Sequence, residues 1–84
     1  MYKVEIAPAA EKQIKALPKK EQEKIIKKVY KLFNDPLPQG VKKLKGIDSL
    51  YQIWQGDWRI VYTIENKKLL VLVVKVAHRR DVYR

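Results

Sequence analysis

The feature that most constrains the fold is the apolar run at residues 69–76, where aliphatic side chains occupy positions of both parities and only Lys75 interrupts them. A short run of this kind predicts a strand covered on both faces, and hence a central strand of a sheet. Residues 77–84 then bring the only histidine, three arginines and a tyrosine to the end of that strand. A buried strand that ends in titratable and cationic side chains is typical of a rigid element that presents a functional site.

The length and the residue content limit the kind of protein this can be. With 84 residues the chain has room for one small domain, which we take to be residues 1–84. It contains no cysteine and one histidine, too few for a disulfide framework or for a metal site built from cysteine or histidine. We therefore expect no metal and no other cofactor.

The charge is strongly unbalanced, because 19 Lys and Arg residues against 9 Asp and Glu residues give a net charge of +10. Such an excess favours nucleic acid, an acidic protein or an anionic surface as the partner. No apolar run approaches the roughly 20 residues that a membrane-spanning helix needs, and residues 2–6 alternate in polarity rather than forming a signal sequence. We expect a cytoplasmic protein with no membrane segment.

The N-terminal half predicts one strand and a pair of helices. Residues 2–6 alternate between apolar and charged side chains, as in a short strand with one solvated face. Two helical patterns follow, and Pro18 separates them because it cannot continue the first helix. The apolar positions are Ala10, Ile14 and Leu17 in the first helix and Ile25, Ile26, Val29, Leu32 and Phe33 in the second, which extends from Lys20 to near Asn34. The two helices are expected to form a hairpin.

The C-terminal half predicts three consecutive antiparallel strands. Residues 50–55 and 58–65 form the first two, joined by a turn at Gly56, and residues 69–76 form the third. The basic segment 41–46 is too short to assign. The expected order is β-α-α-β-β-β, an α+β fold in which the helix hairpin packs on one face of a small, mostly antiparallel sheet.

The alternation along the second of these strands places a cation on the uncovered face of the sheet. Trp58 and Ile60 share the face expected beneath the helices, so Arg59 projects from the other one. A guanidinium offers a planar fork of donors that suits phosphate oxygens, and this face therefore favours a polyanion. The simpler alternative is that Arg59 pairs with Glu65 or Asp57.

Further cations are expected to reach the same face. They come from the tail at residues 76–84 and from the loop lysines Lys42, Lys43 and Lys45. The lysines would add point charge for a phosphate backbone. The alternative for them is an ordinary solvated loop.

Three segments of the chain carry a resemblance to a known family. They are Leu44-Lys45-Gly46 with Leu50-Tyr51, then Gly56-Asp57-Trp58-Arg59-Ile60-Val61-Tyr62, then Val76-Ala77-His78-Arg79-Arg80-Asp81-Val82-Tyr83. In this order and spacing they resemble the RelE/ParE superfamily of bacterial and archaeal toxins, and most closely its RelE branch. The resemblance extends over essentially the whole chain and implies the same fold. It implies a toxin that enters the ribosomal A site, cuts messenger RNA and is silenced by an acidic or amphipathic antitoxin, as a monomer within a hetero-oligomeric complex.

The resemblance also implies a reaction and roles for individual residues. In such ribonucleases the ribose 2′-oxygen attacks the adjacent phosphorus and the 5′-oxygen leaves, without a metal. Arg59 and Arg79 are then expected to stabilise the phosphate, and Tyr83 to orient or stack the substrate. The cations expected to contact RNA are Lys42, Lys43, Lys45, Arg80 and Arg84, although Arg80 and Asp81 alternatively only hold the tail.

The chain departs from the family pattern at two strand positions. Gln52 and Trp54 stand where RelE carries two lysines implicated in proton transfer, and neither can act as a base. His78 is our candidate for that role, because imidazole titrates near neutral pH and the residue adjoins Arg79. Alternatively, His78 is a strand-end residue with a structural hydrogen bond. Trp54 is expected to stack on an RNA base or to contact the antitoxin.

Two other functions stay open. The first is a ParE-like toxin that binds DNA gyrase, against which stands the set Arg59, Arg79 and Tyr83 typical of the RNA-cutting branch. The second is a basic module that binds RNA or ribosomes without cutting, which the loss of both strand lysines favours.

Overall fold

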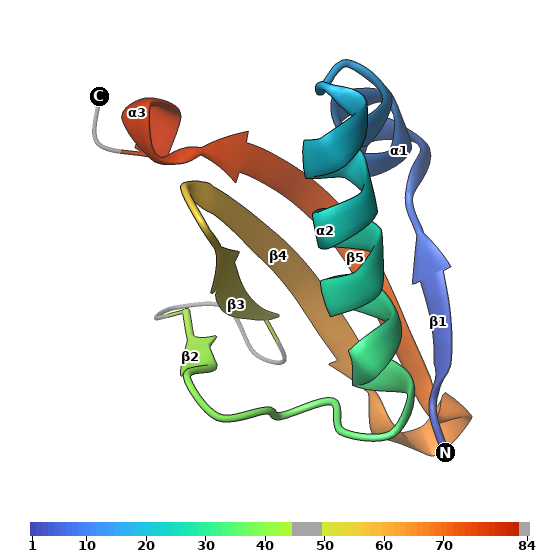
Figure 1. Cartoon of the computed structure of the whole chain (residues 1–84). Helices are drawn as coiled ribbons and strands as arrows, with labels where there is room; N and C mark the ends of the chain where they lie inside the picture. Colours follow the sequence, from blue (N-terminus) through green and yellow to red (C-terminus); the bar gives the residue numbers. More distant parts are fainter. Residues whose placement is uncertain (45–49, 83–84) are drawn as a thin grey trace.

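The computed structural model describes residues 1–44 and 50–82. Its elements in chain order are β1 (Lys3–Ile6), α1 (Pro8–Lys15), α2 (Lys19–Tyr30), the 3-10 helix η1 (Lys31–Phe33), β2 (Lys42–Lys43), β3 (Leu50–Gln55), β4 (Trp58–Glu65), the 3-10 helix η2 (Asn66–Lys68), β5 (Leu70–His78) and α3 (Arg79–Val82). Figure 1 shows the predicted order of elements, to which the structure adds the short β2 and α3. β3 and β4 begin and end at the predicted residues. No helix among the described residues is long and apolar enough to cross a membrane.

The five strands form one sheet in the order β1-β5-β4-β3-β2. β1 runs parallel to β5, and every other pair of neighbours is antiparallel. A parallel pair needs a crossover connection, and the helix hairpin of α1 and α2 lies within the connection that follows β1. Figure 1 shows the helices packed over one face of the sheet, so the predicted α+β fold is confirmed.

The helix hairpin folds around Pro18. α1 ends at Lys15, and Pro18 is the N-cap residue from which α2 begins. The side-chain amide of Gln22 donates hydrogen bonds to the carbonyl oxygens of Leu17 and Lys15, at 2.7 and 3.3 Å. Lys15 is the last residue of α1 and Leu17 lies just beyond it, where carbonyl groups lack partners within the helix. The side chain of Gln22 in α2 therefore links the two helices.

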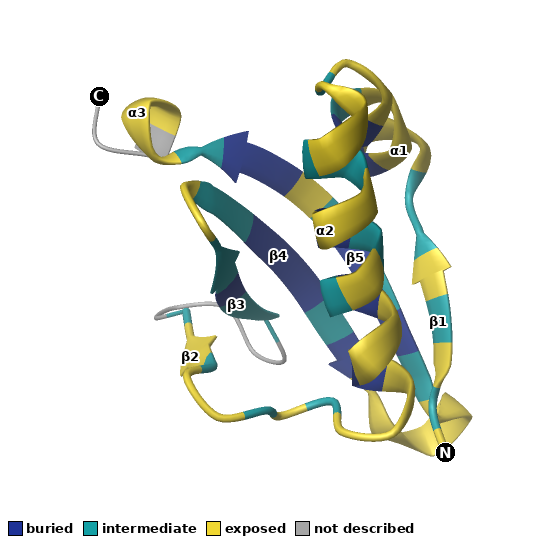
Figure 2. Ribbon diagram, viewed as in Figure 1, coloured by how far each residue is buried: buried dark blue, intermediate teal, exposed yellow. Residues whose placement is uncertain are grey.

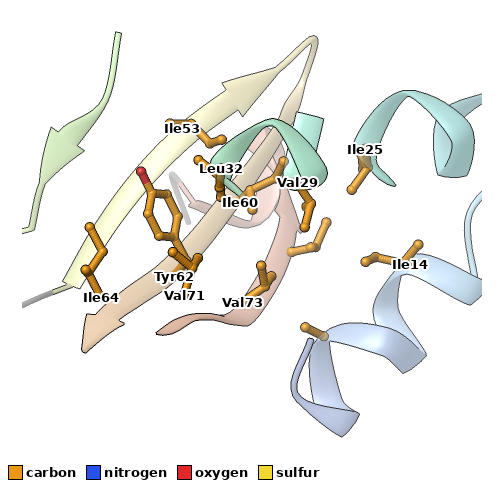
Figure 3. Packing of buried hydrophobic residues seen from close by; sticks show 12 residues of the cluster. Ile14, Ile25, Val29, Leu32, Ile53, Ile60, Tyr62, Ile64, Val71 and Val73 are labelled. Carbon is orange, nitrogen blue, oxygen red and sulfur yellow. The ribbon is translucent and has the colours of Figure 1, made fainter. Parts of the chain in front are cut away.

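One apolar core lies between the helices and the sheet (Figure 3). Its buried members are Ala10, Ile14, Ile25, Val29, Leu32, Ile53, Ile60, Tyr62, Ile64, Val71, Val73 and Val76. Figure 2 shows the complementary pattern, with buried positions along β4 and β5 and exposed ones on the outer side of α2. Phe33, which we predicted to face the core, is 39% exposed. It lies in η1, where the tighter three-residue turn directs Leu32 inward and Phe33 outward.

β5 is an interior strand, but the prediction that it is covered on both faces is wrong. Its buried residues include Val71, Val73 and Val76, and its half-buried residues include Leu70, Leu72 and Val74. The register explains the mixed parity: Val61 pairs with Lys75, yet the next residue of β4 pairs with Val73, so Val74 is an extra residue that forms a bulge. The bulge shifts the alternation by one position and returns Val76 to the core.

Tyr62 anchors the loop that leads into β2. The residue is fully buried, and its hydroxyl donates a hydrogen bond to the carbonyl oxygen of Pro36 at 2.7 Å. Burial, followed by the nearby Asp35 and then Tyr51, raises the pKa of Tyr62 above the ordinary tyrosine value. The bond ties the loop before β2 to the middle of β4.

Candidate functional site

The sheet face opposite the helices, here called the open face, carries several of the residues singled out by the sequence. Because side chains alternate along a strand, the register identifies which residues share this face. One cross-strand row consists of Lys42, Gln52, Val61 and Lys75, and the next consists of Trp54, Arg59 and Ala77. The prediction that Arg59 lies on the uncovered face is confirmed, since the alternate residues Ile60 and Tyr62 are buried beneath the helices.

Arg59 is held by a neutral partner rather than by an acid. Its Nη1 donates a hydrogen bond to the side-chain oxygen of Gln52 at 3.0 Å, and its buried Nε has no hydrogen-bond partner among the described residues. Within the described parts of the chain no carboxylate pairs with it, because Asp57 pairs with Arg79 and Glu65 lies at the far end of β4. The internal ion pair weighed above does not form, and the charge of Arg59 stays available to an anion.

The loop lysines divide between the two faces. Lys42 lies on the open face, whereas Lys43 is in register with Tyr51 and belongs to the helix side of the sheet edge. The prediction that both reach the face of Arg59 is therefore wrong for Lys43, because consecutive strand residues point to opposite faces. Lys45 lies outside the described residues.

Two residues of the open face were not among the predicted RNA contacts. Gln52 was considered only as the replacement for a lysine, yet it is the hydrogen-bond partner of Arg59. Lys75 is exposed and in register with Val61. A single charged residue within an apolar strand was the available signal for Lys75, because a cation there avoids the core.

The turn between β3 and β4 contacts the end of β5 through a hydrogen bond, an ion pair and a pair of rings. The backbone N–H of Arg79 donates a hydrogen bond to the carbonyl oxygen of Asp57 at 2.8 Å, and Arg79 Nη1 lies 3.5 Å from Asp57 Oδ1. The ring of His78 packs edge-on against Trp58, with 4.9 Å between the ring centroids. We call these four residues the tail clasp. Figure 1 shows α3 leaving the sheet beside this turn, where the clasp holds it.

His78 does not face Arg59. It is in register with Trp58 on the helix side, whereas Arg59 is in register with Ala77 on the open face. Its Nδ1 accepts a hydrogen bond from the backbone N–H of Arg80 at 3.2 Å. The expected convergence of the imidazole and the two arginines is therefore absent from the described structure, which brings Arg79 to the hairpin turn but places His78 across the sheet from Arg59.

A hollow of about 350 Å³ lies beside the clasp on the helix side, and His78 lines it. The charged residues around the hollow are Glu21, Lys24 and Asp57. Because these charges are of both signs, the hollow is a poorer site for a polyanion than the open face.

The remaining predicted residues belong to the tail. Arg80 is exposed in α3. Tyr83 and Arg84 lie outside the described residues, so their roles stay predictions. Across residues 1–44 and 50–82, no three side chains of His, Cys, Asp or Glu gather where they could hold a metal ion.

Comparison with known proteins relates nearly the whole chain to one family. The model of the family described as "ParE toxin of type II toxin-antitoxin system, parDE" matches residues 4–83. The toxin RelE of Mycobacterium tuberculosis is 29% identical, over 99% of this chain and 87% of that protein.

Two solved structures share the fold. The archaeal RelE–RelB complex from Pyrococcus horikoshii contains a chain with a TM-score of 0.82 and 28% identity, over 93% of this chain and 94% of that one. The isolated E. coli RelE toxin has a TM-score of 0.81 and 26% identity, over 99% of this chain and 92% of that one. With the sequence motifs, the family match and these structures in agreement, the chain belongs to the RelE/ParE family of toxins of type II toxin–antitoxin systems.

Proposed function

We propose that this toxin is a ribosome-dependent endoribonuclease that cuts messenger RNA in the ribosomal A site. The observation that carries the proposal is Arg59, whose charge stands on the open face without an acidic partner among the described residues. Its cross-strand neighbour Trp54 offers a planar surface on which a base can stack. A cation beside a stacking surface suits a phosphate and the nucleotide attached to it. The relatives named RelE and the net charge of +10 support the same conclusion.

The proposed reaction is attack of the ribose 2′-oxygen on the adjacent phosphorus, with departure of the 5′-oxygen and no metal ion. Arg59 and Arg79 hold the non-bridging oxygens as negative charge builds in the transition state, and Tyr83 orients or stacks the nucleotide. Arg79 first has to leave Asp57. The two side chains of that ion pair are 60% and 61% exposed, and exposed pairs are worth at most about 1 kcal/mol, so a phosphate can replace the carboxylate.

Proton transfer is the step with the fewest candidates. His78 is the proposed base, as the only imidazole in the chain. Because His78 and Arg59 lie on opposite faces, this role requires the tail clasp to open when the substrate binds. The alternative is that His78 only holds the tail, and its packing on Trp58 and the hydrogen bond from Arg80 favour that role.

The proposed partners follow from the family and the charge. A cognate antitoxin with an acidic or amphipathic segment is expected to neutralise the toxin, which we take to be a monomer within a hetero-oligomeric complex in the cytoplasm. The relative from Pyrococcus horikoshii is seen as a RelE–RelB complex. The ribosome and its messenger RNA are the proposed targets, with Lys42, Lys45, Arg80 and Arg84 as contacts, whereas Lys43 would reach the ribosome only from the helix side of the sheet edge.

Two alternatives each have an observation in their favour. The matching family model is described as a ParE toxin, which favours a gyrase-binding toxin. A ribosome-binding protein that does not cut is favoured by Gln52 and Trp54 in place of lysines and by the position of His78 on the helix side.

Cleavage on programmed ribosomes tests the proposal. The purified toxin is mixed with a messenger RNA, with and without ribosomes stalled on a defined codon, and the RNA is resolved on a denaturing gel. We expect discrete cuts only with ribosomes, in the presence of a chelator as well as in its absence. Intact RNA on toxin-bound ribosomes would support the non-cleaving alternative, and no ribosome binding would support gyrase as the target.

A further inference from the structure

Gln52 lies next to Arg59 on the open face and has no part in the mechanism above. The two residues are diagonal neighbours on adjacent strands, since Gln52 is opposite Val61 and Arg59 is opposite Trp54. This spacing brings the amide to the guanidinium, with 3.0 Å between Gln52 Oε1 and Arg59 Nη1. Among the described residues, this is the one hydrogen bond that the guanidinium of Arg59 donates.

We propose that Gln52 is a positioning residue for Arg59, which it holds in the orientation that receives an RNA phosphate. This inference rests on the proposed function, because it assigns the support of a side chain that the function uses. A positioning residue is needed at this site since an arginine side chain has several rotatable bonds, and fixing it before the ligand arrives lowers the entropic cost of binding. Arg59 is half-buried, and among the described residues its Nε–H has no hydrogen-bond partner, so the bond to Gln52 is the polar contact that orients the group.

Gln52 is uncharged, and this matters beside a cation that is to receive an anion. A carboxylate at this position would also accept a hydrogen bond from Arg59, but it would cancel the positive charge and repel a phosphate. A lysine would offer no acceptor and would repel the guanidinium. Glutamine supplies an acceptor without a charge, and therefore holds Arg59 while leaving its attraction for an anion intact.

The contact with Arg59 also determines how the amide of Gln52 is oriented. A guanidinium has only donors, so the amide oxygen of Gln52 has to face it and the NH₂ group has to point away. Lys42, in register with Gln52 on the edge strand, also carries only donors. Apart from the Gln52 oxygen that faces Arg59, the side chains of this row, which are Lys42, Val61 and Lys75, carry no acceptor that would repel an anion.

The test is a double-mutant cycle on RNA binding. The affinity of a short single-stranded RNA is measured by fluorescence anisotropy at low salt for the wild-type toxin, Gln52→Leu, Arg59→Ala and the double variant. Leucine fills a similar volume but accepts no hydrogen bond. The matched control is Gln55→Leu, on the same strand but in register with Trp58 on the helix side. Thermal midpoints establish that each variant is folded.

We expect Gln52→Leu to weaken binding about five-fold, the usual worth of one net hydrogen bond. The control should stay within about two-fold of wild type, and Gln52→Leu should have no further effect in the Arg59→Ala background. Gln52→Glu should weaken binding more than Gln52→Leu, because it keeps the acceptor but cancels the charge.

Three results would overturn the inference. They are wild-type affinity in Gln52→Leu, an equal loss from Gln52→Leu in both backgrounds, and RNA binding that does not depend on Arg59. The proposed function fails separately: if the cycle has the expected form but the wild-type toxin leaves RNA intact on ribosomes, the positioning role stands and the nuclease does not.

Discussion

At the scale of single residues, the face of Arg59 was predictable but its partner was not. Alternation along β4 is sufficient to separate Arg59 from Ile60, because no bulge interrupts this part of the strand. The contact with Gln52 depends on the register of β3 against β4, because a slip by one residue would turn Gln52 to the other face. A sequence alone does not determine this register. The sequence therefore predicted the face on which Arg59 lies, whereas its contact with Gln52 was found only in the structure.

His78 shows the opposite outcome. Counted by parity from Leu72, an unbroken strand would place His78 on the open face with Arg59. The bulge at Val74 shifts the alternation, and His78 instead lies against Trp58 on the helix side. A bulge has no reliable sequence signal inside an aliphatic run, so the sequence does not reveal that His78 lies on the helix side, away from Arg59.

The variant His78→Gln distinguishes the two roles of this residue. The glutamine side-chain oxygen can accept the hydrogen bond from the Arg80 backbone as Nδ1 does, but an amide cannot transfer protons. If His78 is the base, ribosome-dependent cleavage slows by roughly a hundredfold or more. Single-turnover cleavage on programmed ribosomes measures this rate. An unaltered rate in His78→Gln would leave His78 a structural residue of the tail clasp.

At the scale of elements, the sequence predicted β1, the two long helices and the strands β3 to β5, but not β2, α3 or the pairing of β1 with β5. β3 and β4 match residue for residue, because alternating apolar side chains bounded by a Gly56 turn leave little choice. β2 has two residues and acquires its structure only by pairing with β3. The parallel pairing of β1 with β5 joins strands more than 60 residues apart, and no local pattern encodes it. The pairing of β2 with β3 decides which face Lys42 and Lys43 occupy.

Tyr62 provides a prediction about how the loop before β2 is held. Tyr62→Phe removes the hydrogen bond to the Pro36 carbonyl and should lower the free energy of unfolding by about 1 kcal/mol near neutral pH. Because burial raises the pKa of Tyr62 in the folded state, its contribution is present below about pH 10, where tyrosine stays protonated in the unfolded chain, and is lost as the pH rises further. The difference between the two proteins should therefore shrink above that pH.

Urea unfolding at several pH values measures this difference. The control is Tyr30→Phe, since Tyr30 is 58% exposed and its substitution should leave the free energy of unfolding near that of the wild type. A Tyr62→Phe protein as stable as wild type at neutral pH would show that the loop is held by other contacts.

At the scale of the whole molecule, the positive charge of the toxin would attract both proposed partners, the messenger RNA and the antitoxin. The net charge is +10, and three ion pairs form among the described residues, all between exposed side chains. Most of the cations thus lack an acidic partner within the described structure. A messenger RNA and an acidic antitoxin would compete for this charge, which gives the antitoxin a direct way to silence the toxin.

This competition yields a prediction about the antitoxin. The product of an adjacent antitoxin gene should bind the purified toxin, displace a short single-stranded RNA from it, and lose affinity as salt screens the charges. Calorimetry at increasing salt, with RNA anisotropy in parallel, measures each property. An antitoxin that binds equally well at all salt concentrations and leaves RNA bound would show that the two partners use different surfaces.

Whether the toxin cuts messenger RNA in the ribosomal A site is tested by primer extension on a translated message, after induced expression of the toxin in a bacterial host. The wild-type toxin is compared with Arg59→Ala and Arg79→Ala at equal expression, with Lys67→Ala as a control for charge, since Lys67 lies in η2 outside the proposed site. We expect growth arrest with discrete cuts at A-site codons for wild type and Lys67→Ala, and neither arrest nor cuts for the two folded arginine variants. Growth arrest with intact message, or full toxicity in both arginine variants, would contradict the proposed nuclease activity.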